Sequence, residues 1–230
     1  MATPPAPTTK TLLIEDWGFI PYKEAWNRQK AYVQEALADL PHWQDRLILC
    51  EHPPVITLGR NAHKEHLLFP EERLREKGIE LYAIERGGDV TYHGPGQLVG
   101  YPILWLERFR CDISWYMRSL EEVLIRTVGT WGLSATRLPG LTGVWLLNPP
   151  RKIAALGVKL SRWVSMHGFA LNVNTDLRGF SFIVPCGIKD KAVTSIEREI
   201  GRTVPLEEVK GEVVRHFAEV FGVAAVWGER

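Results

Sequence analysis

Residues Gly143–Val173 read GVWLLNPPRKIAALGVKLSRWVSMHGFALNV. They contain three apolar runs, Gly143–Leu147, Ile153–Leu160 and Trp163–Val173, and an Asn-Pro-Pro turn separates the first two. Short apolar runs bounded by turn residues are typical of strands that follow one another in an antiparallel sheet. Consecutive strands beside separate helices favour an α+β fold, a mixed sheet with packed helices, over a strictly parallel βαβ arrangement.

Helices and further strands are predicted on both sides of this stretch. Apolar residues at near-helical spacing predict helices over Tyr22–Leu40, Ser114–Thr130 and Leu206–Phe221, with Asp112 or Ser114 as the candidate N-cap of the second. A charged helical turn is predicted over Glu71–Lys77. Apolar runs predict five more strands, over Thr11–Glu15, Leu47–Glu51, Val55–Leu58, Ile79–Ile84 and Leu98–Leu106. Five glycines between Arg86 and Gly100 predict a loop-rich hairpin there.

The length of 230 residues corresponds to about one and a half domains. We expect a disordered lead over residues 1–10, a main domain over 11–184 and a small C-terminal lobe over 185–230 packed on it. The change in character that suggests this boundary falls near Phe180–Pro185.

Composition excludes several classes of protein. The chain has 28 Lys and Arg against 27 Asp and Glu, a net charge of +1, which argues against a strongly basic nucleic-acid binder. A hydrophobic content of 45% excludes a mostly disordered chain. No stretch approaches the roughly 18 apolar residues that span a bilayer, and the N-terminus lacks the apolar core of a signal peptide. The seven histidines are scattered without metal-ligand spacing. We therefore expect a cytoplasmic protein with no nucleic-acid partner, no membrane partner and no metal.

The glycine-rich segment Arg86–Gln97, RGGDVTYHGPGQ, is a candidate ligand loop. Paired glycines let the backbone approach a ligand closely and expose its N–H groups. Arg86 can anchor a carboxylate or phosphate, and His93 adds a polar ring. The segment is neither a P-loop nor a Rossmann fingerprint. A hairpin turn that needs positive φ at its glycines is the alternative.

The three cysteines are too few and too odd in number for a disulfide scaffold, which indicates a reducing compartment. Cys50 and Cys111 are interpreted as packing residues. Cys186, between Pro185 and Gly187, lies on a constrained turn and is the candidate nucleophile. A free thiol is mostly protonated at neutral pH, so it needs a nearby cation or base.

Three side chains are candidates for activating this thiol: His93, His167 and Lys152. Lys152 stands at the start of an apolar strand, where desolvation would lower its pKa and make it available as a base. A surface lysine at a strand end is the alternative, and Lys159 in the same strand is a rival. Spacing does not choose among them, because the partner of a catalytic cysteine is adjacent in space rather than in sequence.

Four motifs in this order resemble those of lipoyl(octanoyl) transferases: RGGDVTYHGPGQ at 86–97, KIAALG at 152–157, HGFALN at 167–172 and PCG at 185–187. The resemblance implies a catalytic domain with the fold of biotin and lipoate protein ligases. It implies transfer of an octanoyl group from acyl carrier protein to a lysine ε-amine. The acceptors would be lipoyl domains of 2-oxoacid dehydrogenases and the glycine-cleavage H protein.

The resemblance also assigns roles to residues. Cys186 would carry the acyl group as a thioester, and Lys152 would activate the thiol, with no cofactor. The substrate contacts would be Arg86, Gly87, Gly88, Asp89, Val90, Thr91, Tyr92, His93, Ala155, Leu156, Gly157, Gly168, Phe169 and Ala170.

Three other functions remain as alternatives. The nearest is an ATP-dependent lipoate or biotin protein ligase on the same fold, whose loop typically has a third consecutive glycine and in which Cys186 would have no role. The others are a cysteine thioesterase and an acyl-binding module without turnover.

Overall fold

The computed structural model describes residues 10–184 and 192–228. Within this part of the chain, nine strands form a main sheet in the order β12-β1-β2-β6-β10-β9-β8-β7, with β11 paired to β9, and three form a small sheet in the order β4-β3-β5. The main sheet consists of β1 (Lys10–Phe19), β2 (Arg46–Glu51), β6 (Gln97–Ile103), β7 (Ala135–Leu138), β8 (Leu141–Leu146), β9 (Arg151–Ser161), β10 (Val164–Asn172), β11 (Ala192–Val193) and β12 (Val223–Trp227). The small sheet consists of β3 (Val55–Leu58), β4 (Glu80–Ala83) and β5 (Val90–His93). This arrangement confirms the predicted mixed α+β class.

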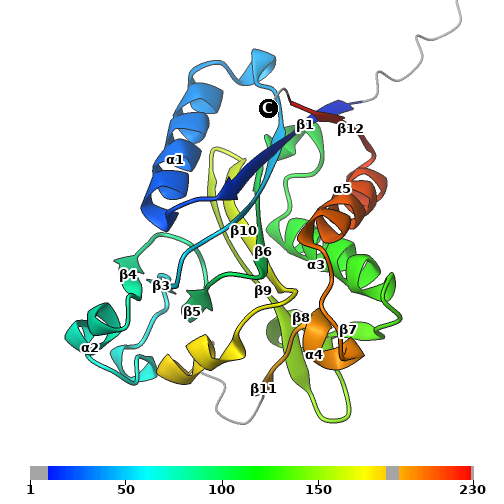
Figure 1. The fold of residues 1–230 in the computed structure, drawn as a ribbon. Coiled ribbons are helices and arrows are strands. Elements are labelled where there is room, and N and C mark those ends of the chain that lie inside the picture. The colour runs from blue at the N-terminus through cyan, green and yellow to red at the C-terminus, as the bar shows by residue number, and fades with distance from the viewer. Residues whose placement is uncertain (1–9, 185–191, 229–230) are drawn as a thin grey trace, which may run out of the picture.

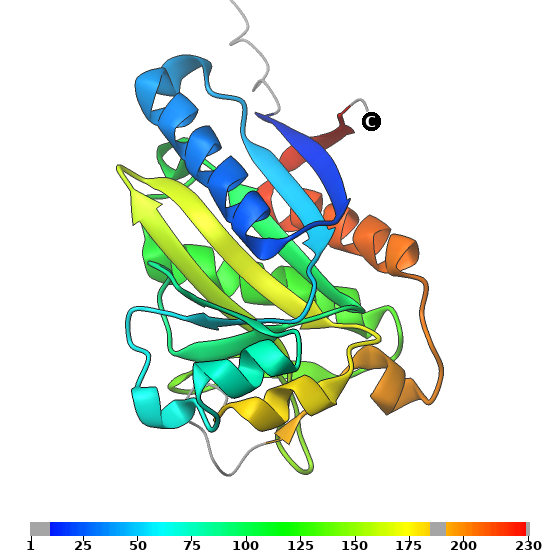
Figure 2. The same cartoon turned by 60° about the vertical axis from the view of Figure 1, so that its left-hand side comes forward.

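Helices cover both faces of the main sheet (Figures 1 and 2). The α-helices are α1 (Tyr22–Ala38), α2 (Glu71–Glu76), α3 (Ile113–Gly129), α4 (Ile196–Ile200) and α5 (Leu206–Phe221), and the 3-10 helices are η1 (Leu40–His42), η2 (Lys64–His66), η3 (Leu106–Arg108) and η4 (Leu177–Phe182). Helix α1 lies on one face, and α3 and α5 lie on the other. The long helices follow the predicted spans closely, and the Asp112 side chain caps α3 by accepting a hydrogen bond from the Trp115 N–H at 3.0 Å.

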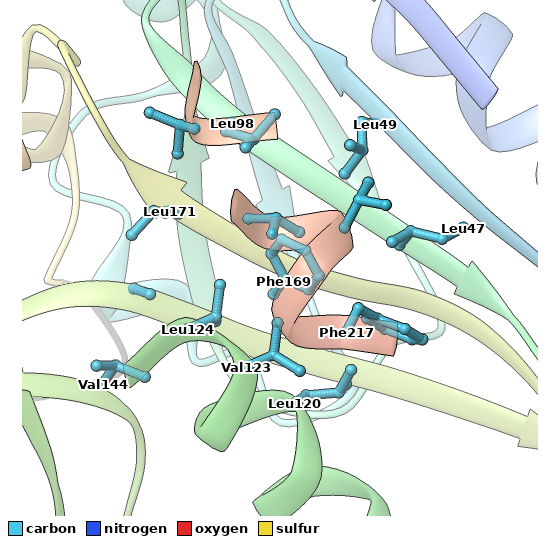
Figure 3. Close-up of a cluster of buried hydrophobic side chains, with 14 of the residues drawn as sticks. Leu47, Leu49, Leu98, Leu120, Val123, Leu124, Val144, Phe169, Leu171 and Phe217 are labelled. Atoms are coloured by element: carbon cyan, nitrogen blue, oxygen red, sulfur yellow. The ribbon is translucent and has the colours of Figure 1, made fainter. Parts of the chain in front are cut away.

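Alternation along the central strands divides their side chains between two cores. In β2, Leu47 and Leu49 belong to the core under α3 and α5, whereas Ile48 and Cys50 belong to the core under α1. Figure 3 shows the first of these cores, where strand side chains meet the α3 and α5 side chains. The main sheet is therefore buried on both faces, and it supports the site rigidly.

Strands β8, β9 and β10 are consecutive and antiparallel, as Gly143–Val173 predicts. Arg162 and Trp163, with φ of 47° and 63°, form the tight turn between β9 and β10. In this pair Ala155 lies opposite Ala170 and Gly157 opposite Gly168. Two of the predicted contact motifs are thus aligned side by side.

The prediction of a hairpin over Arg86–Gly100 is wrong. Strand β5 pairs with β3 in the small sheet, while β6 pairs with β2 and β10 in the main sheet. Between them Gly96 has φ of 78°, and its N–H donates to the Glu51 carboxylate at 2.7 Å. The glycines therefore carry the chain from one sheet to the other instead of folding it back on itself.

The C-terminal elements pack on the preceding chain. Strand β12 pairs in parallel with β1, and α5 contributes to the same core as α3. The boundary expected after residue 184 stays a prediction. None of the described helices is both long and apolar enough to cross a bilayer.

Candidate active site

A cavity of about 490 Å³ lies where the glycine-rich loop meets β9, β10 and the start of α1. It is mostly apolar, as expected for a site that takes an alkyl chain. Three of the four sequence motifs contribute to its walls, which are Tyr22, Arg86, Gly88, Asp89, Thr91, His93, Val99, Tyr101, Ala155, Leu156, Gly157, His167, Gly168, Phe169 and Ala170.

The predicted contact residues of β5 divide by strand alternation. Thr91 and His93 line the cavity. Val90 and Tyr92 point the other way and are buried in the core of the small sheet, where the Tyr92 ring lies 5.4 Å from that of Phe180. A strand presents every second side chain to one face, so a continuous block of contact residues is divided in this way.

Arg86 attaches the loop to the small sheet. Its guanidinium donates to the Thr57 carbonyl at 2.8 Å and to the Thr57 hydroxyl at 3.0 Å. The neighbouring Gly87 N–H donates to the Val158 carbonyl at 2.9 Å, which joins the loop to β9, and Gly87 itself lines an outer groove next to the cavity. The positive charge of Arg86 thus positions the loop as well as lining the cavity.

Two motif glycines allow backbones to approach closely. A Cβ on Gly157 would lie 2.7 Å from the Gly87 carbonyl oxygen, and a Cβ on Gly168 would lie 2.2 Å from the Gly100 carbonyl oxygen. Any side chain at these positions would push the loop off β9 or separate β10 from β6. These glycines therefore determine the shape of the cavity.

A chain of buried hydrogen bonds runs from His93 toward the backbone of Lys152. The Gln97 amide nitrogen donates to Asn172 Oδ1 at 2.9 Å and to the Tyr92 carbonyl at 3.2 Å, so Gln97 Oε1 is the acceptor for His93 Nδ1 at 2.7 Å. His93 therefore carries its proton on Nδ1. Burial lowers its pKa to about 3, which keeps the ring neutral at physiological pH.

The chain continues through Asn172, whose Nδ2 donates to the Thr194 carbonyl at 2.9 Å. The Thr194 N–H in turn donates to the Lys152 carbonyl at 2.9 Å. Asn172 of the HGFALN motif thus connects the glycine-rich segment with the strand that carries the lysine. Sequence reasoning assigned no such role to Gln97 or Asn172.

Lys152 is buried, with 6% exposure, so the alternative of a surface lysine does not hold. Its Nζ lies 4.8 Å from the centre of the Trp145 ring. It lines a compartment of about 280 Å³ that shares Thr91, Ala155 and Ala170 with the cavity. It also lines the open groove, of about 950 Å³. Lys152 therefore stands between a closed space and one that an outside molecule can enter.

Cys186 lies outside the described residues. The chain resumes in β11, where Val193 lies opposite Lys152 in parallel register. The proposed thiol and lysine thus belong to segments whose described parts meet in one sheet.

Comparison with known proteins agrees with this geometry. Residues 21–218 match the family model of the lipoyl protein ligase A/B catalytic domain. The chain is 50% identical over 229 residues to an octanoyltransferase of Cytophaga hutchinsonii, covering 93% of this chain and 94% of that one. It is also 50% identical over 220 residues to an octanoyltransferase of a Nostoc species, covering 96% of each.

The chain belongs to the octanoyltransferase family. It is an acyltransferase, and its fold is that of the lipoate protein ligases. A lipoate-protein ligase A bound with ATP superposes with a TM-score of 0.73 at 18% identity, over 96% of this chain and 88% of that one. A bipartite lipoate protein ligase from Thermoplasma acidophilum has a TM-score of 0.71 at 20% identity, over 96% and 86%.

His167 of this octanoyltransferase has unusual backbone and side-chain surroundings. Its φ is 61°, and its N–H donates to the Gln29 side-chain oxygen at 3.0 Å. Left-handed backbone at a residue other than glycine costs about 1–3 kcal/mol. Both ring nitrogens are buried without a hydrogen-bond partner among the described residues. Burial lowers the pKa of His167 to about 3.

The other candidates lie away from the octanoyltransferase cavity. Cys50 is fully buried with its Sγ 3.6 Å from His52 Nε2, and burial raises the pKa of its thiol. Cys111 is exposed. Lys159 pairs with Glu85 at 3.2 Å and lines neither the cavity nor the groove. Among residues 10–184 and 192–228, no group of three or more His, Cys, Asp or Glu is placed to hold a metal ion.

Sequence reasoning missed three walls of the cavity: Tyr22, Val99 and Tyr101. Val99 and Tyr101 share one face of β6, a two-residue spacing that was present in the sequence. Tyr22 begins α1 and reaches the site only through tertiary packing, where its ring stacks on His93 at 5.8 Å. No local signal marks it.

Proposed function

We propose that this octanoyltransferase takes the octanoyl group from acyl carrier protein, holds it as a thioester on Cys186 and passes it to a lysine ε-amine of a lipoyl domain. The observation that carries the proposal is the position of Lys152. Its side chain lines both the closed compartment that adjoins the apolar cavity and the open groove. The acyl chain occupies the cavity, and the protein-bound donor and acceptor approach through the groove.

The first step exchanges one thioester for another. Lys152 accepts the Cys186 proton, and the thiolate attacks the carbonyl carbon of the donor thioester. The carbon–sulfur bond to the carrier breaks, and the carrier leaves as a thiol after taking up a proton. Because one thioester replaces another, this step is nearly balanced in free energy.

The second step forms an amide. The neutral amine of the acceptor lysine attacks the Cys186 thioester, Lys152 takes up a proton from the nitrogen, and the cysteine is released as a thiol. An amide is more stable than a thioester, so the transfer proceeds without ATP. The relatives that are about half identical to this chain are named octanoyltransferases, which favours transfer over the ATP-dependent ligase alternative.

The partners follow from this chemistry. The donor is octanoyl-acyl carrier protein, and the acceptors are the lipoyl domains of 2-oxoacid dehydrogenases and the glycine-cleavage H protein. A nucleophilic cysteine has to stay reduced, which suits the cytoplasm as the place of the reaction.

The acyl adduct tests the proposal. Incubation with octanoyl-acyl carrier protein in the absence of ATP is expected to add one octanoyl group to Cys186, detected by intact-mass and peptide mass spectrometry. Cys186→Ser is expected to abolish transfer to a lipoyl domain, while Cys111→Ser transfers at the wild-type rate. An adduct on Cys50 or Cys111, or transfer that needs ATP, would contradict the covalent mechanism.

A second arm of the same experiment tests the lysine. Lys152→Met is expected to form the adduct at least about 100-fold more slowly at neutral pH, the contribution typical of a general base. Lys159→Met is the matched control on the same strand. Adduct formation by Lys152→Met at the wild-type rate would assign thiol activation to another group, such as His93.

A further inference from the structure

The acyl cavity has two ends along the β9–β10 pair. One end lies at Ala155 and Ala170, which are also walls of the compartment that Lys152 lines. The other end lies at His167, which is opposite Val158 in the register. Three residue steps separate the two levels, which is about 10 Å at about 3.4 Å per strand residue.

This distance matches the acyl group. An extended residue covers about 3.3–3.6 Å over three backbone bonds, so the seven carbon–carbon bonds of an octanoyl chain extend about 8 Å. With its carbonyl near the Lys152 compartment and its methyl group added to that length, the chain ends at the His167 ring. A longer chain would have to displace this ring.

The surroundings of His167 resist such a displacement. Its backbone N–H is held by the Gln29 side-chain oxygen at 3.0 Å, and Gln29 is itself fully buried. The left-handed φ of 61° fixes where the side chain leaves the strand. Its two unpartnered ring nitrogens, in a residue only 2% exposed, make the ring a polar end to an otherwise apolar cavity. Strained backbone and orphaned buried nitrogens together are more than packing requires.

We propose that His167 is the end wall of the acyl site and sets the upper limit of the acyl-chain length that this enzyme transfers. This inference rests on the proposed function, since it places the thioester near Lys152. An eight-carbon chain fills the cavity up to the ring, and additional methylenes meet the imidazole.

Chain-length competition tests the assignment. His167→Gly removes the wall and tolerates the positive φ. We expect the kcat/KM ratio of dodecanoyl- to octanoyl-acyl carrier protein to rise at least about tenfold, because the added methylenes can then be buried. Intact-mass detection of a dodecanoyl adduct on Cys186 gives a readout that does not depend on turnover. His167→Asn, which also tolerates positive φ, is expected to give a smaller rise and serves if the glycine variant folds poorly.

Arg162→Gly is the matched control, because Arg162 also has a positive φ, of 47°, but is exposed at the far turn of the hairpin. It is expected to leave the ratio unchanged. An unchanged ratio in both His167 variants, with octanoyl still added to Cys186, would overturn the end wall and leave the proposed function standing. An equal loss of transfer at every chain length would instead place His167 beside the thioester and also overturn it. Loss of the Cys186 adduct from the wild-type enzyme would contradict the proposed function itself.

Discussion

His93 and His167 both line the acyl cavity, but their polar surroundings are opposite. Both rings are buried, and burial lowers both pKa values to about 3. His93 belongs to a hydrogen-bond chain that leads through Gln97 toward Lys152. His167 has no partner for either ring nitrogen among the described residues. The same residue type, equally buried, is thus suited to holding the catalytic strand in one place and to closing a cavity in the other.

The difference follows from where each side chain is attached. His93 ends β5, three residues before β6 begins, and Gln97 at that start reaches back to it. His167 lies in β10 at a point where its N–H bonds to the Gln29 side chain rather than to a strand. A polar ring inside a network is held by its partners, whereas a ring outside one is held by its backbone.

Breaking the network of His93 should have the largest effect. Gln97→Leu leaves His93 Nδ1, the Tyr92 carbonyl and Asn172 Oδ1 without their partner, at about 1–3 kcal/mol for each unpaired group. We expect the free energy of unfolding to fall by about 3 kcal/mol and octanoyl transfer to fall about 100-fold, as small misplacements of catalytic groups do. Denaturant unfolding and a lipoyl-domain acylation assay measure the two.

Gln29→Leu is the matched control, because Gln29 is an equally buried glutamine that serves His167 instead. It should lower stability to a similar degree but leave more of the octanoyl transfer. If both glutamine variants lose transfer equally, the distinction between the two histidines fails.

The pH dependence of stability should treat the two histidines alike. Their folded pKa values lie near 3, below the unfolded value of about 6.5, so the unfolded state binds more protons between these values. The free energy of unfolding therefore falls as the pH falls below about 6.5. Each histidine should contribute about 1.4 kcal/mol to the decrease between pH 7.5 and 5.5. His93→Asn and His167→Asn should each remove that amount in denaturant titrations at the two pH values, and a decrease equal to wild type would show that the ring is protonated in the folded state.

The ion pair near His167 should matter least. Lys159 and Glu85 are about a quarter exposed and 3.2 Å apart, and pairs of this kind contribute less than about 1 kcal/mol. Lys159→Met should change the unfolding free energy by no more than that, and the chain-length preference should stay that of wild type. A shift toward longer chains in this variant would assign the end of the cavity to the charges around His167 rather than to its ring.

Local patterns predicted most of the elements. Apolar spacing located α1, α3 and α5 within a few residues, and turn residues located the antiparallel strands β8 to β10. The glycine-rich segment misled because closely spaced strands with glycines between them usually form a hairpin. The partners of β5 and β6 lie far away in the chain, and a local pattern does not contain them.

The candidate site was predicted in part for the same reason. The motifs identify which segments approach the substrate, and most of their residues line the cavity. Strand alternation then turns Val90 and Tyr92 away into the small-sheet core. The catalytic assignment of Cys186 with Lys152 stays a prediction that the adduct experiment addresses.

By itself the sequence determined the fold class, the order of the motifs and the need for glycine at Gly157 and Gly168, because periodicity and backbone freedom are local properties. Only the tertiary structure decided that Tyr22 closes the cavity, that Gln97 and Asn172 connect it to Lys152, and that His167 stands at its end without partners. Hydrogen bonding and burial depend on which distant segments are brought together, and that is settled by packing the whole chain.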